Sequence, residues 1–143
     1  MRIEKGHVAG GELNGQTTAR DLGLGKMIKK NGDFIGKVMA EREGLMEPDR
    51  PALVGLRPVN KSERLRGGAH IVRHRAGTDS EGWVTSAHKS FEHGCFVALG
   101  MLRRGPQRHG DRLFAVYPLK NEAVEVEVTS PHHVDPENVR VRA

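Results

Sequence analysis

Cysteine and aromatic residues are scarce in this chain of 143 residues. The single cysteine, Cys95, excludes an internal disulfide, and its place in an apolar run at residues 95–99 predicts a buried, unreactive thiol. Aromatic side chains make up only 4% of the sequence, so a basic groove in which bases stack on aromatic rings is not expected. We therefore expect no nucleic-acid partner.

Long apolar stretches are missing as well. The chain has no run of about eighteen apolar residues and does not open with a basic segment followed by an apolar one, so neither a membrane span nor export is expected. A cytoplasmic location follows as the default expectation. The net charge of +5 comes from cations scattered along the chain. Scattered charge indicates a solvated surface and suits an anionic ligand or an acidic partner subunit equally well.

The sequence also lacks the motifs of several cofactor and metal sites. Residues 22–26 are rich in glycine, but Arg20 and Met27 stand where a phosphate loop needs glycine and Ser or Thr. On a strand, the spacing of His70 and His74 would hold the two residues roughly 13 Å apart, too far for one ion. No dinucleotide-binding fingerprint is present. We predict no metal site.

The sequence does contain a change in the periodicity of its apolar residues near residue 50. Before it, glycines and short apolar clusters in residues 1–32 predict one or two strands joined by loops. Asp33 is a suitable N-cap for a helix over residues 34–43, and Gly44 would end it. Beyond Pro51, apolar and polar residues alternate. This alternation predicts strands at residues 52–57, 69–73, 83–90, 96–102, 112–117 and 123–129.

Short alternating strands separated by glycine turns are typical of a small antiparallel barrel or sandwich. The predicted fold class is therefore α+β and mainly β, with one helix ahead of six antiparallel strands.

Several motifs, taken in their order and spacing, resemble one family. They are Arg2-Ile3-Glu4-Lys5-Gly6, the run at residues 26–37, and Gly82-x-Val84-Thr85-Ser86-x-x-x-Ser90. Together they resemble the folate-dependent aminomethyltransferases, which include the T-protein of the glycine cleavage system, and within them most of all the sarcosine oxidase branch. Lys26 stands near a position that is often aromatic in the transferases, and this departure favours the oxidase branch.

The resemblance implies a division of the chain into two parts. Residues 1–47 would be the end of a folate-binding domain, with one helix, and residues 48–143 would be the family's carboxyl-terminal antiparallel barrel. The chain would then be the last third of a larger module, with the family's catalytic aspartate upstream. We therefore expect no catalytic residue in it.

The resemblance implies a partial tetrahydrofolate site formed by Arg2 and Lys26. An arginine fork can grip a carboxylate or the polar edge of a pterin through two hydrogen bonds. Two plainer interpretations stay open, in which Arg2 is disordered or pairs with a neighbouring acid and Lys26 is a solvated side chain at a strand end. Thr85 and Ser86 are expected to be structural.

The function implied is that of a carboxyl-terminal part of a sarcosine oxidase alpha subunit, supporting oxidative demethylation of sarcosine to glycine with transfer of the one-carbon unit to tetrahydrofolate. FAD, FMN and NAD are expected only in the rest of the parent complex, whose other subunits are the expected partners. Two alternatives stay open: part of a glycine cleavage aminomethyltransferase, and a free-standing folate-binding or interaction module.

Overall fold

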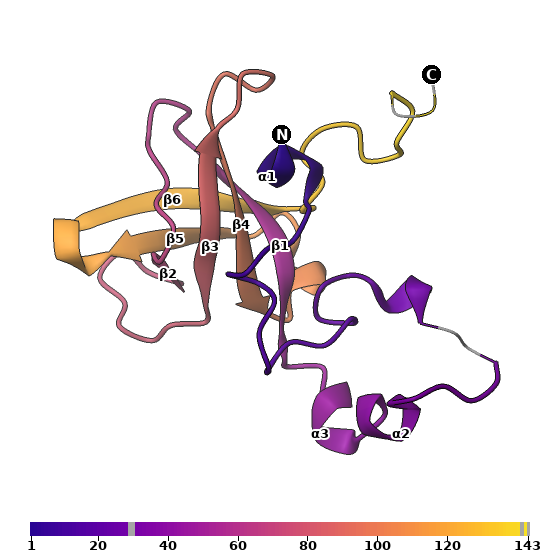
Figure 1. Cartoon of the computed structure of the whole chain (residues 1–143). Coiled ribbons are helices and arrows are strands. Elements are labelled where there is room, and N and C mark those ends of the chain that lie inside the picture. Colours follow the sequence, from indigo (N-terminus) through magenta and orange to yellow (C-terminus); the bar gives the residue numbers. More distant parts are fainter. Residues whose placement is uncertain (29–30, 141, 143) are drawn as a thin grey trace.

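A closed barrel of six antiparallel strands forms the centre of the computed structural model, which describes residues 1–28, 31–140 and 142 (Figure 1). The strands follow one another around the barrel in the order β1-β4-β3-β2-β5-β6, and β1 pairs with both β4 and β6. All six predicted strands are present, so the predicted mainly β fold is confirmed. Their bounds are β1 Pro51–Pro58, β2 His70–Val72, β3 Gly82–Lys89, β4 Phe96–Arg103, β5 Arg112–Tyr117 and β6 Glu122–Thr129.

The alternation of the sequence accounts for the filled interior of the barrel. In β6, Val124, Val126 and Val128 are buried, whereas Glu127 between them is exposed. Inward-facing residues of the other strands complete this core, and closure leaves the sheet without a free edge. Cys95, just before β4, is buried as predicted.

The predicted strands in residues 1–32 are absent from the described part of that segment, which excludes residues 29 and 30. It forms helix α1 (Arg2–Lys5), a series of turns and the short helix η1 (Gly25–Met27). Gly6 and Gly23 have φ values of 75° and 74°, in the left-handed region, which interrupts an extended backbone.

This N-terminal segment packs against the outside of the barrel rather than against itself. Helix α1 contacts β3 and β4, and Figure 1 shows the chain continuing across the outer face of the same strands. A second apolar cluster lies between the segment and the barrel, composed of Ile3, Val8, Leu22, Leu53, Leu99 and Met101.

The single helix predicted over residues 34–43 is wrong in extent. Two one-turn helices stand near it, α2 (Lys37–Ala40) and α3 (Glu43–Met46), and the latter contains Gly44, which was expected to end the helix. The N-cap of α2 is Gly36, with φ 92°, and not Asp33.

The physical reason is that the predicted apolar stripe of this helix packs against little. Ile35 and Val38 are exposed, so burial of an apolar face does not stabilise a longer helix here. Asp33 instead lies 3.8 Å from Lys37 as an exposed ion pair.

Two further short helices, η2 (Gly105–Arg108) and η3 (Pro118–Lys120), connect barrel strands. In the part of the chain that the structure describes, no helix has the length and apolar character needed to cross a bilayer.

Candidate functional site

Arg2, the first residue of α1, is held in place by three parts of the chain. Its Nη2 donates a hydrogen bond of 2.7 Å to Ser86 Oγ on β3, and its Nη1 donates one of 2.9 Å to the carbonyl of His7. Nη1 also lies 3.7 Å from a carboxylate oxygen of Glu12. The interpretation in which Arg2 pairs with a neighbouring acid is therefore realised, and the side chain is still 39% exposed.

The other two defining residues of the Arg-x-Glu-x-Gly motif also contact the second half of the chain. Glu4 accepts a hydrogen bond of 2.5 Å from the hydroxyl of buried Ser90, and this bond lowers the pKa of the Glu4 carboxyl. At Gly6 a Cβ atom would lie 2.7 Å from the carbonyl oxygen of Pro131. The motif thus attaches the N-terminal segment to the barrel.

Glu12 is completely buried, which was not expected from the sequence. Its carboxylate accepts hydrogen bonds from the hydroxyls of Thr85 and Ser86 on β3, and from the backbone N–H of Ala9 at 2.7 Å. An acid in a glycine-rich turn gives no sequence signal of burial, since acidic residues in turns are usually solvated.

A cavity of about 480 Å³ opens beside Arg2. This volume is within the range of small-molecule sites. Its walls are formed by residues of α1, the turn after it and the C-terminal tail: Met1, Arg2, Glu4, Lys5, His7 and Val134.

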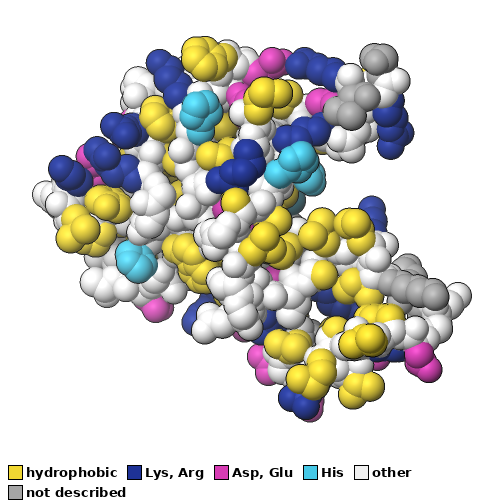
Figure 2. All heavy atoms as spheres, in the orientation of Figure 1, with side chains coloured by type: hydrophobic (Ala, Val, Ile, Leu, Met, Phe, Trp, Pro, Cys, Tyr) yellow, Lys and Arg dark blue, Asp and Glu magenta, His cyan; other side chains and the backbone are white. Residues whose placement is uncertain are grey.

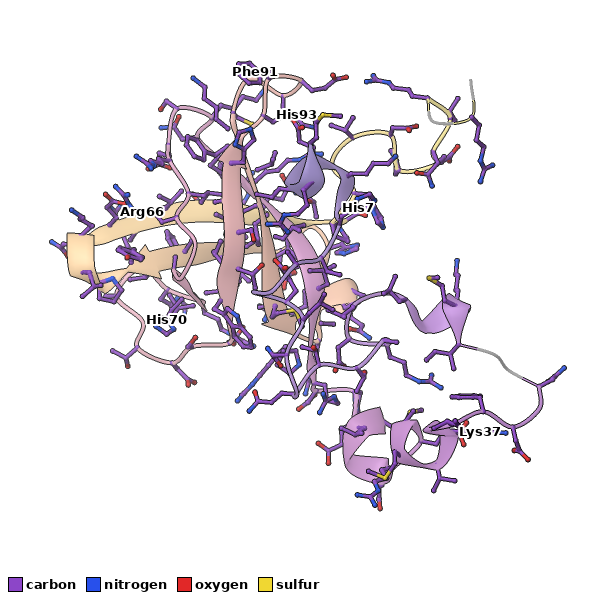
Figure 3. The ribbon with its side chains drawn as sticks, in the orientation of Figure 1. His7, Lys37, Arg66, His70, Phe91 and His93 are labelled. Carbon is purple, nitrogen blue, oxygen red and sulfur yellow. The ribbon has the colours of Figure 1, made fainter. Side chains whose placement is uncertain are left out.

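The surface around this region is deeply hollowed. Figure 2 shows the hollow between the part that carries the two termini and the part that carries α2 and α3. His7 lies on one side of this gap and Lys37 on the other (Figure 3).

Of the two predicted folate-binding residues, Arg2 and Lys26, the structure places only Arg2 on the wall of this cavity. Arg2 lines the cavity, and the hydrogen bonds described use two of its five N–H donors, so the guanidinium keeps capacity for a ligand. Lys26 lies exposed on η1 and does not line this cavity. The surface that lines the cavity is mostly apolar, and Arg2 adds a guanidinium that fits a ligand with an anionic or carbonyl edge.

The C-terminal tail is held to the barrel and to α1 by polar contacts of its own. His133 is buried, and its Nε2 lies 3.0 Å from the carbonyl oxygen of Ala98 while Arg57 Nε lies 3.3 Å from its Nδ1. Burial lowers the pKa of His133 to about 4. Lys5 of α1 forms an ion pair of 3.0 Å with Asp135.

Comparisons with known proteins agree with this architecture. Over residues 52–135 the chain matches the family model described as the glycine cleavage T-protein C-terminal barrel domain. A crystal structure of the glycine cleavage system aminomethyltransferase T from Bartonella henselae superposes with a TM-score of 0.78, covering 94% of this chain and 37% of that one. At 24% identity, this likeness shows the fold alone.

Two curated relatives are similar over almost the whole chain. It is 41% identical over 145 residues to the sarcosine oxidase subunit alpha of Rhizobium meliloti (strain 1021), which covers 99% of this chain. It is 35% identical over 146 residues to the subunit of the same name from Corynebacterium sp. (strain U-96), covering 98% of this chain. The chain spans 15% of the length of each relative.

The resemblance predicted from the motifs is confirmed by these matches. Since the matched domain occupies more than half of the chain and includes the barrel strands except for the first residue of β1, the chain belongs to the family of glycine cleavage T-protein C-terminal barrel domains.

Proposed function

We propose that this chain works as part of a sarcosine oxidase alpha-type subunit, in which its N-terminal segment and barrel form one wall of a tetrahydrofolate site. The observation that carries the proposal is Arg2, which is held by Ser86 and Glu12 and is half-exposed on the wall of a 480 Å³ cavity. The 41% identity to a relative named sarcosine oxidase subunit alpha supports the oxidase branch.

In this proposal Arg2 binds an anionic or carbonyl edge of the folate through its free N–H donors. Lys5 also lines the cavity, but its charge is paired with Asp135, so Arg2 is the main cationic contact. Lys26 is proposed as a second folate-binding residue. Its helix η1 precedes α2 on the other side of the hollow, so Lys26 would contact a more distant part of the ligand than Arg2 does (Figure 1).

The chemistry of the parent complex lies outside this chain in the proposal. The complex would oxidise sarcosine to glycine and pass the one-carbon unit to tetrahydrofolate, with FAD, FMN and NAD bound by its other parts. The chain itself would contribute the folate wall and contact surface for the remaining subunits. Purified alone, it should neither release peroxide from sarcosine nor form methylenetetrahydrofolate.

The experiment uses a chimera in which this chain replaces the matching segment of the Rhizobium meliloti subunit. Calorimetry with tetrahydrofolate should show that Arg2→Ala weakens binding by about 1.5–3 kcal/mol, the scale of a hydrogen bond to a charged group. Arg75→Ala is the matched control, because Arg75 is an exposed arginine that does not line the cavity. Unchanged affinity in the Arg2 variant would remove Arg2 from the folate site.

The natural protein that carries this chain separates the proposal from the aminomethyltransferase alternative, because in the chimera the chemistry comes from the Rhizobium meliloti parts. If that natural protein transfers an aminomethyl group to folate without consuming an oxidant, the aminomethyltransferase branch is correct. If the isolated chain binds tetrahydrofolate as tightly as the chimera does, the chain is a free-standing folate-binding module.

A further inference from the structure

The carboxyl group of Glu12 lies in a place without exposure to water. Burial of a carboxylate costs free energy unless hydrogen bonds and an opposite charge compensate it. Thr85, Ser86 and the backbone of Ala9 supply the hydrogen bonds. Among the described residues, Arg2 is the cation within 4 Å of this carboxylate, at 3.7 Å.

A β-bulge in β3 makes this arrangement possible. The pairing of β3 with β4 shifts between Val84 and Ser86, so that Thr85 is an extra residue on β3. Neighbouring side chains of a regular strand point to opposite faces. Here Val84 and Ala87 both pack against the barrel core, and the two hydroxyls between them reach the same oxygen of Glu12 outside it. Bulges commonly re-aim side chains in this way.

Ser86 connects the buried acid to the arginine. Its hydroxyl donates to Glu12 Oε1 at 3.2 Å, which leaves its lone pairs to accept the bond of 2.7 Å from Arg2 Nη2. A hydroxyl has one proton to donate. Because Ser86 donates that proton to Glu12, its lone pairs are left to accept the hydrogen bond from Arg2. Arg2 is thereby held both by charge and by a directed hydrogen bond, although it stands second in the chain.

We propose that Glu12 is a positioning residue that acts through Ser86 and directly on Arg2, aiming the guanidinium at the cavity lined by Met1, Lys5 and Val134. The inference rests on the proposed function for the identity of the ligand, but the geometry that carries it is independent of that ligand. Glu12 itself does not touch the cavity and has no role in the chemistry.

The first test concerns Arg2 without any ligand. In nitrogen-15 NMR spectra of the full chain, the signal of the Arg2 Nη2–H group that donates to Ser86 should be protected from solvent exchange. Glu12→Gln keeps the shape of the side chain and removes the charge, and should abolish this protection. Asp21→Asn is the matched control: Asp21 is also a buried acid of the N-terminal segment, but it pairs with Arg50 at 2.7 Å and does not contact Arg2. It should leave the signal protected.

Ser86→Ala is the second variant, in case Glu12→Gln does not fold as judged by circular dichroism. It removes the relay and leaves the charge pair, and should also abolish protection of the signal. A protected Arg2 signal in a folded Glu12 or Ser86 variant would overturn the proposal, as would an unprotected signal in the unmodified chain.

The second test measures tetrahydrofolate affinity in the chimera described above. Glu12→Gln should weaken binding about tenfold, the scale of one hydrogen bond to a charged group, and Asp21→Asn should not. In an Arg2→Ala background Glu12→Gln should have no further effect, because a positioning residue acts only through the residue that it positions. A full tenfold loss in that background would show a general structural role and contradict the proposal. No effect of Arg2→Ala alone would reject the folate assignment instead, leaving the NMR result to decide the action of Glu12 on Arg2.

Discussion

His133 couples the stability of this fold to pH at the level of one side chain. Its pKa is about 4 in the folded chain, below its value of 6.5 in the unfolded chain. Between these values the unfolded chain binds more protons, so the contribution of His133 is complete above pH 6.5 and is lost as the pH falls toward 4. We expect the free energy of unfolding to decrease by about 2 kcal/mol between about pH 7.5 and 5 from this group.

Urea unfolding at the two pH values measures this change. His133→Gln keeps a donor for the carbonyl of Ala98 but does not titrate, and should therefore flatten the pH dependence in this range. Glu4 does not interfere, because its lowered pKa places the loss of its contribution below its ordinary value of 4.5. An unchanged slope in the variant would assign the acid sensitivity to other groups.

The close passage of β3 and β4 makes a glycine necessary within this pair of strands. A Cβ atom at Gly82 would lie 2.1 Å from the carbonyl oxygen of Met101 and 2.9 Å from the Cα of Leu102, and both are backbone atoms of β4. The strand backbones would have to separate to admit a methyl group. Gly82→Ala should therefore destabilise the barrel by about 3 kcal/mol, measured by urea unfolding.

Gly10→Ala provides the control for this prediction. A Cβ atom at Gly10 would have no neighbour within 4 Å, so the change should alter stability by less than about 0.5 kcal/mol. Equal effects of the two substitutions would mean that the strands separate at little cost.

In contrast to the closely packed strands β3 and β4, the short helices α2 and α3 make few contacts with the barrel. Their apolar side chains, such as Val38 and Met39, are exposed. Local pattern alone predicted one amphipathic helix here, and its apolar face lacks a packing surface in the described part of the chain.

At the scale of the whole molecule, noncovalent contacts hold the N-terminal segment against the barrel. This attachment does not depend on the covalent link through the chain between them. Buried Glu12 and Asp21 and the apolar contacts of Leu22 hold residues 1–24 against the barrel. Trypsin should cut first between residues 26 and 47, where Lys26 and Arg42 are exposed. The N-terminal fragment should then still elute with the barrel in size-exclusion chromatography.

Two results would contradict this prediction. Release of the N-terminal fragment without denaturant would show that the contacts of Glu12 and Asp21 are too weak to hold it. First cleavage inside the barrel, for instance after Arg103, would show that β4 opens more readily than the linking chain. The division of the chain at residue 48 stays a prediction, which the position of the first cut addresses directly.

The amino-acid sequence by itself determined the barrel and the family of this protein. The strands after Pro51 were predictable because alternation with a period of two specifies which side chains face the core, and tertiary packing agrees with that local preference. The motifs around Arg2 and Ser86 were recognisable because they consist of particular residue types at fixed spacing.

Only the tertiary structure decided where residues 1–28 and 31–47 lie and what the motif residues touch. Their turns and one-turn helices depend on glycine conformations and on contacts with β1, β3 and β4, which no local pattern contains. Glu12 shows the reason most clearly. Its partners Thr85 and Ser86 are more than seventy positions away, and they face it together only because a bulge interrupts β3, so its burial follows from the pairing of distant strands and not from its sequence neighbours.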